Sequence, residues 1–407
     1  MQETTTVPGF GNFVRNTAHS ALAKYGRTFS PHLLNSLRLG FTRSYRHALQ
    51  ENYRTDAGAL WNVPWLNLRP RDLGFPALNI AGYSTVGDAT QLPIERYTNT
   101  YQFSDALSWL HGSHLWKFGI DVRRQQANAT LDYFARGSLS FSGALSGSGI
   151  GDLLLGLPSF ALQSQFDNPQ TMRATQHGYY VQDDWKPLRR LTLSIGLRYE
   201  YDSPVTDPHD RMSTFDPATN KIVRVGAGGV LRSVTRPDRN NFAPRVGISR
   251  AVNERITVRA GYGIYYDAGM FVINSSQYFN PPFFTVRVFF PTASSLLSLS
   301  NPFPATGGIT PVPSPNAVSP DARTAYLQHW SFSAQYSMGA RTSVQLAYAG
   351  SKGTALVHSR DLNQPSPAPG DIQSRRPVPT VGSIFFTETS GNSKLQLFAG
   401  LGRPARR

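Results

Sequence analysis

The sequence contains no cysteine and few charged residues. Without Cys, the 407-residue chain has no disulfide, no thiolate nucleophile and no cysteine ligand for zinc. Charged residues make up 16% of the chain, whereas an average soluble protein has about 25%. No apolar run reaches about 18 residues, which excludes a transmembrane helix. The first residues carry neither a basic nor an apolar segment, so no secretory signal peptide is recognisable.

Aromatic residues and turn formers are abundant. Phe, Trp and Tyr make up 12% of the chain, and there are 35 Gly and 29 Pro residues. This composition excludes a coiled coil, a helical bundle and a highly charged disordered chain. The net charge is +15, from 40 basic and 25 acidic residues. Arginine binds phosphates and carboxylates, so nucleic acid, lipopolysaccharide and anionic lipid are all conceivable partners. Because the arginines are scattered, a compositional preference for Arg explains the charge equally well.

Strict alternation of apolar and polar residues is the dominant pattern. In residues 191–201, Leu, Ile and Tyr at the odd positions alternate with Thr, Ser, Gly, Arg and Glu at the even positions. Similar alternation recurs in segments 33–45, 101–122, 241–266 and 328–348. A period of two predicts β-strands, since an amphipathic helix would repeat at three and four residues. Alternating stretches of roughly ten to thirteen residues match the length that crosses a bilayer at a tilt.

The polar face of these strands indicates which kind of sheet they form. Gly, Ser, Thr, Gln, Arg, Lys and Glu would fill a dry core poorly, but they suit a wide, wetted lumen. Aromatic residues concentrate at strand ends, as the girdles of membrane barrels do. The sequence therefore favours an all-β fold, an antiparallel up-and-down transmembrane β-barrel. A soluble sheet with one face in water remains the alternative.

Long connections alternate with short turns. Segments 51–93, 203–240 and 292–322 are rich in Gly, Pro, Ser and Asn, whereas the turns within the hairpins are short. Short turns on one side and long loops on the other are typical of outer-membrane barrels. We expect the long segments to be mobile loops without a single conformation.

The clearest family resemblance lies in GYYVQDDWK at 178–186 and LTLSIGLRYE at 191–200. These segments resemble the central barrel hairpin of TonB-dependent outer-membrane receptors, in particular the Oar-like branch with a carboxypeptidase-regulatory-like domain. Segments 29–43, 243–247, 259–267 and 348–353 fit the same family in the same order. The resemblance implies an outer-membrane location, a plug domain and TonB as partners, and the import or export of a large or scarce solute.

The chain also departs from the family pattern. A plug domain and an energy-coupling box are not recognisable, and we count roughly twelve to fifteen strand candidates against about 22 in a full barrel. We therefore expect a partial barrel whose plug domain is absent, with residues 1–393 as the barrel segment. Residues 394–407 read as a basic tail that a truncation or frameshift would produce.

Charged residues on the polar face are the candidates for contacts with a plug or a polar solute. These predicted lumen-facing residues are Arg38, Lys117, Asp121, Arg123, Arg198, Glu200 and Arg259. Loop aromatics on which a carbohydrate could stack are Trp61, Trp65, Tyr278 and Phe283. Packing of loop against loop explains these four rings equally well.

No pattern in the sequence predicts catalysis, a metal or a cofactor. Asp183 and Asp184 are neighbours in a strand, so their carboxylates point to opposite faces. His111 and His114 flank a tight turn, but a metal site would need further ligands. Protease, hydrolase and phosphate-loop motifs are missing from the sequence. The alternatives to a receptor are a passive outer-membrane pore, a soluble Arg-rich protein that binds nucleic acid, and an inactive product of a decayed gene. For a receptor we expect no nucleic-acid partner.

Overall fold

The structure of the chain is a computed structural model. It describes residues 2–3, 7–166, 169–267, 269, 274–292, 295–305, 309, 311–339 and 342–404. None of the helices in these ranges is long and apolar enough to span a membrane.

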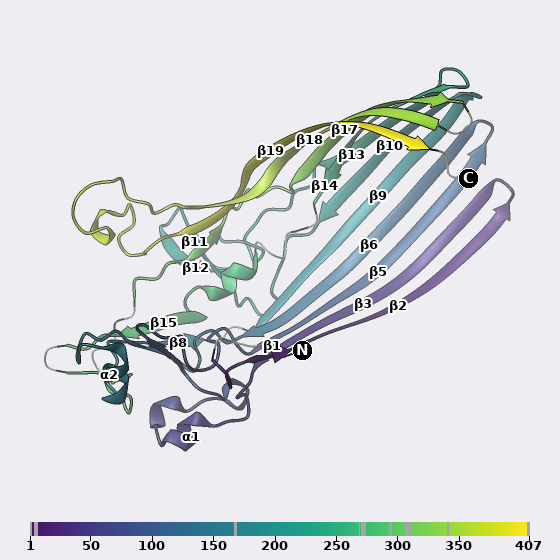
Figure 1. Cartoon of the computed structure of the whole chain (residues 1–407). Helices are drawn as coiled ribbons and strands as arrows, with labels where there is room; N and C mark the ends of the chain where they lie inside the picture. Colours follow the sequence, from purple (N-terminus) through teal and green to yellow (C-terminus); the bar gives the residue numbers. More distant parts are fainter. Residues whose placement is uncertain are drawn as a thin grey trace.

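Eleven long antiparallel strands dominate the described part of the chain (Figure 1). They are β2 (Asn12–Ser30), β3 (Leu33–Gln50), β5 (Ile94–His111), β6 (His114–Leu131), β9 (Gln170–Leu188), β10 (Leu191–Asp202), β13 (Asn241–Ala251), β14 (Ile256–Tyr266), β17 (Tyr326–Met338), β18 (Thr342–Asp361) and β19 (Phe385–Pro404). Each pairs with the next long strand along the chain, which is the up-and-down order predicted from the alternation. Two short strands, β1 (Gln2–Glu3) and β16 (Asn316–Val318), pair with β2 and β19.

The predicted hairpins are confirmed, although their strands are longer than the alternating stretches. Strands β5 and β6 stay in register from Ile94–Leu131 down to His111–His114, where Gly112 takes the positive φ of the turn. At the β13–β14 turn, the Asn253 side chain accepts hydrogen bonds from two backbone amides, at 2.9 Å each. The alternation pattern did not predict β2 as a complete strand.

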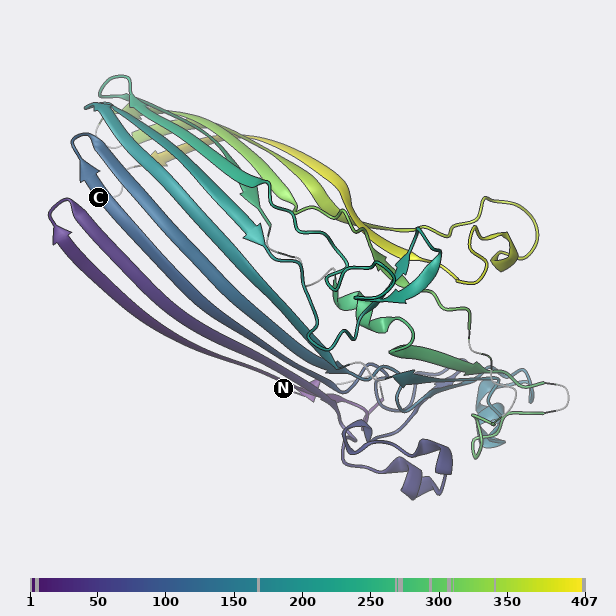
Figure 2. The same ribbon diagram turned by 180° about the vertical axis from the view of Figure 1, so that it is seen from behind.

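The long strands form an open, curved sheet, and Figures 1 and 2 show it from two sides. In the part of the chain that the structure describes, the two strands of each hairpin meet at one end of the sheet, the turn end, and the long connections leave from the other, the loop end. Edge strands β2 and β19 both run from the loop end to the turn end. In the described residues they do not pair with each other, so the sheet is open along both edges.

The long connections are folded, in contrast to the mobile loops expected from sequence. They contain a four-stranded sheet of order β15-β8-β7-β4, a hairpin, two helices and several 3-10 turns. Their bounds are β4 (Ala77–Ile80), β7 (Ser138–Phe141), β8 (Phe160–Phe166), β11 (Ser213–Asp216), β12 (Lys221–Arg224), β15 (Phe284–Phe289), α1 (Ala57–Trp61), α2 (Gly149–Leu154), η1 (Pro64–Leu66), η2 (Pro70–Asp72), η3 (Ser276–Phe279) and η4 (Gln373–Arg375). We call this folded region the cap.

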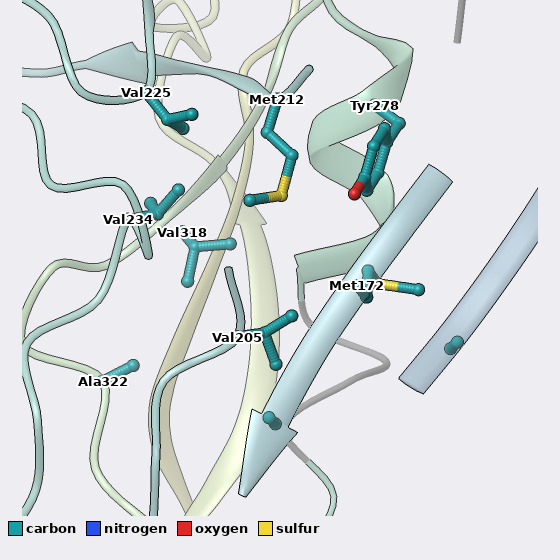
Figure 3. Packing of buried hydrophobic residues seen from close by; sticks show 10 residues of the cluster. Met172, Val205, Met212, Val225, Val234, Tyr278, Val318 and Ala322 are labelled. Atoms are coloured by element: carbon teal, nitrogen blue, oxygen red, sulfur yellow. The ribbon is translucent and has the colours of Figure 1, made fainter. Parts of the chain in front are cut away.

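An apolar cluster joins the cap to the sheet (Figure 3). Loop residues Met212, Val234 and Tyr278 pack with Ala127 of β6 and Met172 of β9. Ala127 lies an even number of positions from Lys117 and Asp121 in β6, whose pairing with β5 is unbroken, so the three side chains point to the same face of the sheet. The cap therefore covers the face that carries the polar candidates. We call this the inner face and the opposite one, rich in aromatic and aliphatic side chains, the outer face.

The last strand departs from this distribution of polarity. β19 runs without interruption through residue 393, at which the sequence pattern breaks. Beyond that point Leu395 and Leu397 pair with Ser351 and Ala349 of the inner face. Apolar residues thus occupy the polar face there. Moving the alternation pattern by one residue along the strand has this effect, because it transfers every side chain to the opposite face. The boundary between a barrel segment and a tail at residue 394 stays a prediction.

Candidate functional site

Four of the seven predicted lumen-facing residues come together on β6 and β10. In β6, Asp121 accepts from Arg123 Nε at 2.9 Å and from Gln102 Nε2 at 2.6 Å. In β10, Arg198 Nε donates to Glu200 Oε1 at 2.6 Å. Asp121 and Glu200 both pair with Gly178 of the intervening strand β9, so the two ion pairs are neighbours.

Gly178 provides the space that this cluster needs. A Cβ at this position would overlap Arg198 Nη2, which means that the guanidinium lies directly over the glycine backbone. The four residues, Asp121, Arg123, Arg198 and Glu200, form a charge-balanced patch that we call the inner ion cluster. Its charged groups can hold polar groups of a partner or solute through charge-assisted hydrogen bonds.

Lys117 belongs to a second network nearer the turn end. Its Nζ donates to Asp184 Oδ2 at 2.7 Å, and the Asp184 carboxylate also accepts from Ser194 at 2.6 Å and Gln182 at 3.0 Å. Asp183 lies on the outer face and contacts His114 Nδ1 at 2.6 Å. The two carboxylates therefore diverge, as the strand geometry predicts.

The remaining two inner-face candidates lie apart from the cluster. Arg38 is exposed on β3, where it pairs with Lys24 and Ser104. Arg259 is on β14, and its Nη1 donates to Gln335 Oε1 at 3.4 Å. The seven residues thus share a face but do not form a single site.

A pocket of about 220 Å³ on the inner face was missed from the sequence. It lies beside Arg245, whose guanidinium stacks 4.4 Å from the centre of the Tyr265 ring. Glycines of β10, β13 and β14 line its floor, which exposes the backbone to any molecule inside. The sequence feature that could have revealed it is the position of Arg245 in the alternating pattern, which places this residue on the polar face, where it pairs with Gly196 and Gly263.

The four loop aromatics do not share a binding surface. Trp61 packs against Phe75 with ring centres 5.3 Å apart. Trp65 contacts Phe303 at 5.2 Å, and its Nε1 donates to a backbone carbonyl at 3.0 Å. Phe283 lies under the Arg224 guanidinium at 5.3 Å. Loop packing accounts for these three contacts.

Tyr278 differs from the exposed stacking ring expected from sequence. It is fully buried in the cap, where its hydroxyl donates to Asp207 Oδ2 at 2.6 Å and accepts from the Thr171 amide at 3.2 Å. Burial with two polar partners explains the difference, because the ring is part of the cap core and no solute can stack on it in this arrangement.

The cap contains a buried charge cluster that the sequence did not reveal. Asp132 is fully buried and accepts from Arg71 Nε at 2.6 Å and Arg69 Nη2 at 3.1 Å. Buried Arg136 donates to three backbone carbonyls. Burial, with the neighbouring Asp72 carboxyl, raises the pKa of Asp132 to about 7. These contacts fasten segment 69–73 to segment 132–136.

The described residues contain no group of three His, Cys, Asp or Glu side chains arranged to hold a metal ion. His111 and His114 are paired in register across their turn, and His114 stacks on Trp185 with ring centres 5.3 Å apart. The two histidines thus lie among the aromatic rings at the turn end of the sheet.

Comparison with known proteins agrees with this geometry. Residues 1–396 match the family described as outer membrane beta barrel domain. The chain belongs to this family. It is therefore an outer-membrane β-barrel protein, built on a large antiparallel sheet. A search of curated proteins found no match.

A solved structure of an outer-membrane transporter shares the fold, and lower scores are found for two further proteins. The transporter YddB from Escherichia coli has a TM-score of 0.59 at 12% identity, covering 99% of this chain and 41% of its own. The FrpB iron transporter from Neisseria meningitidis has a TM-score of 0.49 at 11% identity, with coverages of 96% and 42%. The pyoverdine receptor FpvA from Pseudomonas aeruginosa PAO1 has 0.47 at 11%, with 97% and 42%. The chain spans less than half the length of these proteins.

Proposed function

We propose that this chain is the barrel portion of a TonB-dependent outer-membrane receptor that binds and imports a large or scarce solute. The observation that carries the proposal is the charged inner face beneath a folded cap, on an outer-membrane sheet of long meandering strands. A polar, wetted interior suits passage of a hydrophilic solute. The resemblance in segment 178–200 supports assignment to the Oar-like branch. Export of the solute, instead of import, is the alternative direction of transport within this proposal.

The open edges support the proposal that further strands complete the barrel. Backbone groups left unpaired in lipid cost several kcal/mol each, so a bare edge is unfavourable. Because β2 and β19 run in the same direction, closing the sheet on itself would require a parallel pair in an otherwise antiparallel barrel. Antiparallel strands from another segment or chain can satisfy both edges. Within this proposal, the inner ion cluster contacts a plug domain, and TonB supplies the energy coupling.

Solute binding to the chain in lipid nanodiscs tests the proposal. The probes are a panel of ferric siderophores and oligosaccharides, and the readout is saturable quenching of tryptophan fluorescence. We expect the signal to be lost in the double variant Trp61→Phe/Trp65→Phe, because these two rings are the tryptophan reporters of the cap. Trp109→Phe is the matched control, since this ring lies on the outer face near the turn end. We expect no catalytic turnover of any probe.

A passive pore is the competing function. It requires a closed barrel in which β2 and β19 are neighbours, so a scan of cysteine pairs between the outer faces of the two strands (Ala21, Ala23 and Tyr25 against Gln396 and Phe398) would include a pair that forms a disulfide within one chain. Such a disulfide, together with a stable single-channel conductance and no saturable binding, would contradict the receptor proposal. We expect the disulfide to be absent and no uniform conductance to occur.

A further inference from the structure

An acidic side chain lies in the middle of the apolar outer face. The outer-face residues of β5 are, in order, Tyr101, Phe103, Asp105, Leu107 and Trp109. Asp105 therefore has two apolar or aromatic residues on each side of it along the strand. Across the sheet it pairs with Leu37 of β3 and Ile120 of β6. An ionisable side chain is costly at this depth of a bilayer, which makes it a candidate for a functional role.

Within the described residues, one oxygen of the Asp105 carboxylate has a hydrogen-bond partner and the other does not. Asn35 Nδ2 donates to Oδ1 at 2.8 Å, and no side chain forms an ion pair with Asp105. By contrast Asp183, an outer-face acid nearer the turn end, contacts His114 Nδ1 at 2.6 Å. The Oδ2 atom of Asp105 can therefore accept a hydrogen bond from a bound molecule.

Asp105 lies at one end of a groove of about 470 Å³ on the outer face. Two rows of paired residues form the groove across the neighbouring strands β5, β6, β9 and β10. The first row is Asp105, Ile120, Tyr179 and Tyr199, and the second is Leu107, Phe118, Val181 and Leu197. Neighbouring strands lie about 4.8 Å apart, so the groove is about 14 Å long. Asp105 is the one charged residue that lines it.

We propose that this groove binds a lipophilic amine dissolved in the membrane. The hydrocarbon chain lies along the groove, and the ammonium group donates a hydrogen bond to Asp105 Oδ2. Small-molecule sites are concave and mostly apolar, occupy about 300–1,000 Å³ and contain a few polar groups that fix the orientation of the ligand. Away from water an ion pair requires close contact and further hydrogen bonds. Asn35 supplies such a bond to the same carboxylate.

The charge and the shape of the groove together favour an amine over other occupants. An acyl chain of the bulk lipid would need only the apolar walls and would leave the carboxylate without a cation. A protein partner would cover a larger and flatter area, about 800 Å² on each side of a typical interface. The proposal depends on the outer-membrane location of the sheet. Solute import plays no part in it, so either proposal can fail without the other.

Photolabelling of the full chain in phosphatidylcholine nanodiscs tests this inference. The probe is dodecylamine with a diazirine in its chain, and mass spectrometry identifies the labelled peptides. We expect saturable labelling of β6 and β9 that unlabelled dodecylamine displaces. Asp105→Asn should raise the amine concentration for half-maximal labelling at least about tenfold, because the ammonium group loses its counter-ion away from water. Asp183→Asn is the matched control, since this outer-face acid lies outside the groove, and it should be labelled as the unmodified chain is.

Two further arms test the shape of the groove and the charge of the ligand. Leu197→Trp keeps the carboxylate but fills the groove, so it should also weaken labelling. Dodecanol with the same diazirine should label the groove weakly, and equally in the unmodified chain and in Asp105→Asn. Far-ultraviolet circular dichroism and protease resistance should be the same for all variants. The proposal is wrong if folded Asp105→Asn is labelled normally, if Asp183→Asn loses labelling equally, or if dodecanol labels as strongly as the amine.

Discussion

Single residues decide which parts of the cap are tightly fastened. Tyr278 and Asp132 are both fully buried, and each makes polar contacts with distant segments. Burial of such groups is favourable only when hydrogen bonds or ion pairs replace water. Changing one partner therefore leaves the other unsatisfied, and the effect should be localised to the cap.

Removing the Tyr278 hydroxyl should destabilise the cap. In Tyr278→Phe, the buried Asp207 carboxylate loses a 2.6 Å hydrogen bond and the Thr171 amide loses its acceptor. We expect a loss of about 1–3 kcal/mol, because buried polar groups are left without a partner. Thermal unfolding monitored by limited proteolysis of the cap measures it. Tyr83→Phe, at an exposed ring, should have no effect, and equal stability of both variants would contradict the assignment.

Asp132 should make the stability of the cap depend on pH. Its pKa is raised from 3.8 to about 7 in the folded chain, so folding favours the protonated form. The stabilisation is complete below about pH 4, declines between about pH 4 and 7, and is lost above that range. We expect amide protection in segments 69–73 and 132–136, corrected for intrinsic exchange, to fall as the pH rises from about 5 to about 8. Hydrogen exchange checks this.

The variant Asp132→Asn serves as the control for the pH profile. It removes the titrating carboxyl, so protection in the two segments should no longer vary over this pH range. A profile in the variant that matches the unmodified chain would show that another group is responsible.

Among the secondary-structure elements, the long strands were predicted from the sequence more completely than the short elements of the cap. The hairpins from β5 to β18 follow from period-two alternation, because one face meets apolar surroundings and the other does not. β2 was missed because its outer face carries Arg15, His19 and Arg27 between apolar residues, which interrupts the pattern. The cap elements are short, and their core draws single residues from many loops, so no period reveals them.

The two faces of one strand should respond oppositely to a charge. Phe332 lies on the outer face of β17, where an arginine should cost about 2–4 kcal/mol at the middle of the bilayer. Ser331, its neighbour, lies on the inner face beside the pocket, and Ser331→Arg should be nearly neutral. Urea unfolding of both variants in lipid vesicles compares them. Equal destabilisation would contradict the assignment of faces.

At the scale of the whole molecule, the large antiparallel sheet and the family to which it belongs place the protein in the outer membrane. The arrangement of the candidate site was harder to predict from the sequence than the fold. Parity alone placed Asp121, Arg123, Arg198 and Glu200 on one face. It could not show that Gly178 brings them into one cluster, because that depends on register between strands. The buried charges of the cap depend on tertiary contacts between segments about sixty residues apart, such as Arg71 and Asp132. No local pattern encodes such contacts.

The central claim is that the outer face contacts lipid while the inner face contacts water. Since the chain has no native cysteine, single cysteines at positions 193–198 of β10 can be labelled with an environment-sensitive fluorophore in lipid vesicles. Labels at Leu193, Ile195 and Leu197 should be quenched by lipid-attached quenchers, and labels at Ser194, Gly196 and Arg198 by aqueous iodide. A period of two in both profiles is the predicted result. Uniform iodide quenching along the strand would contradict the account.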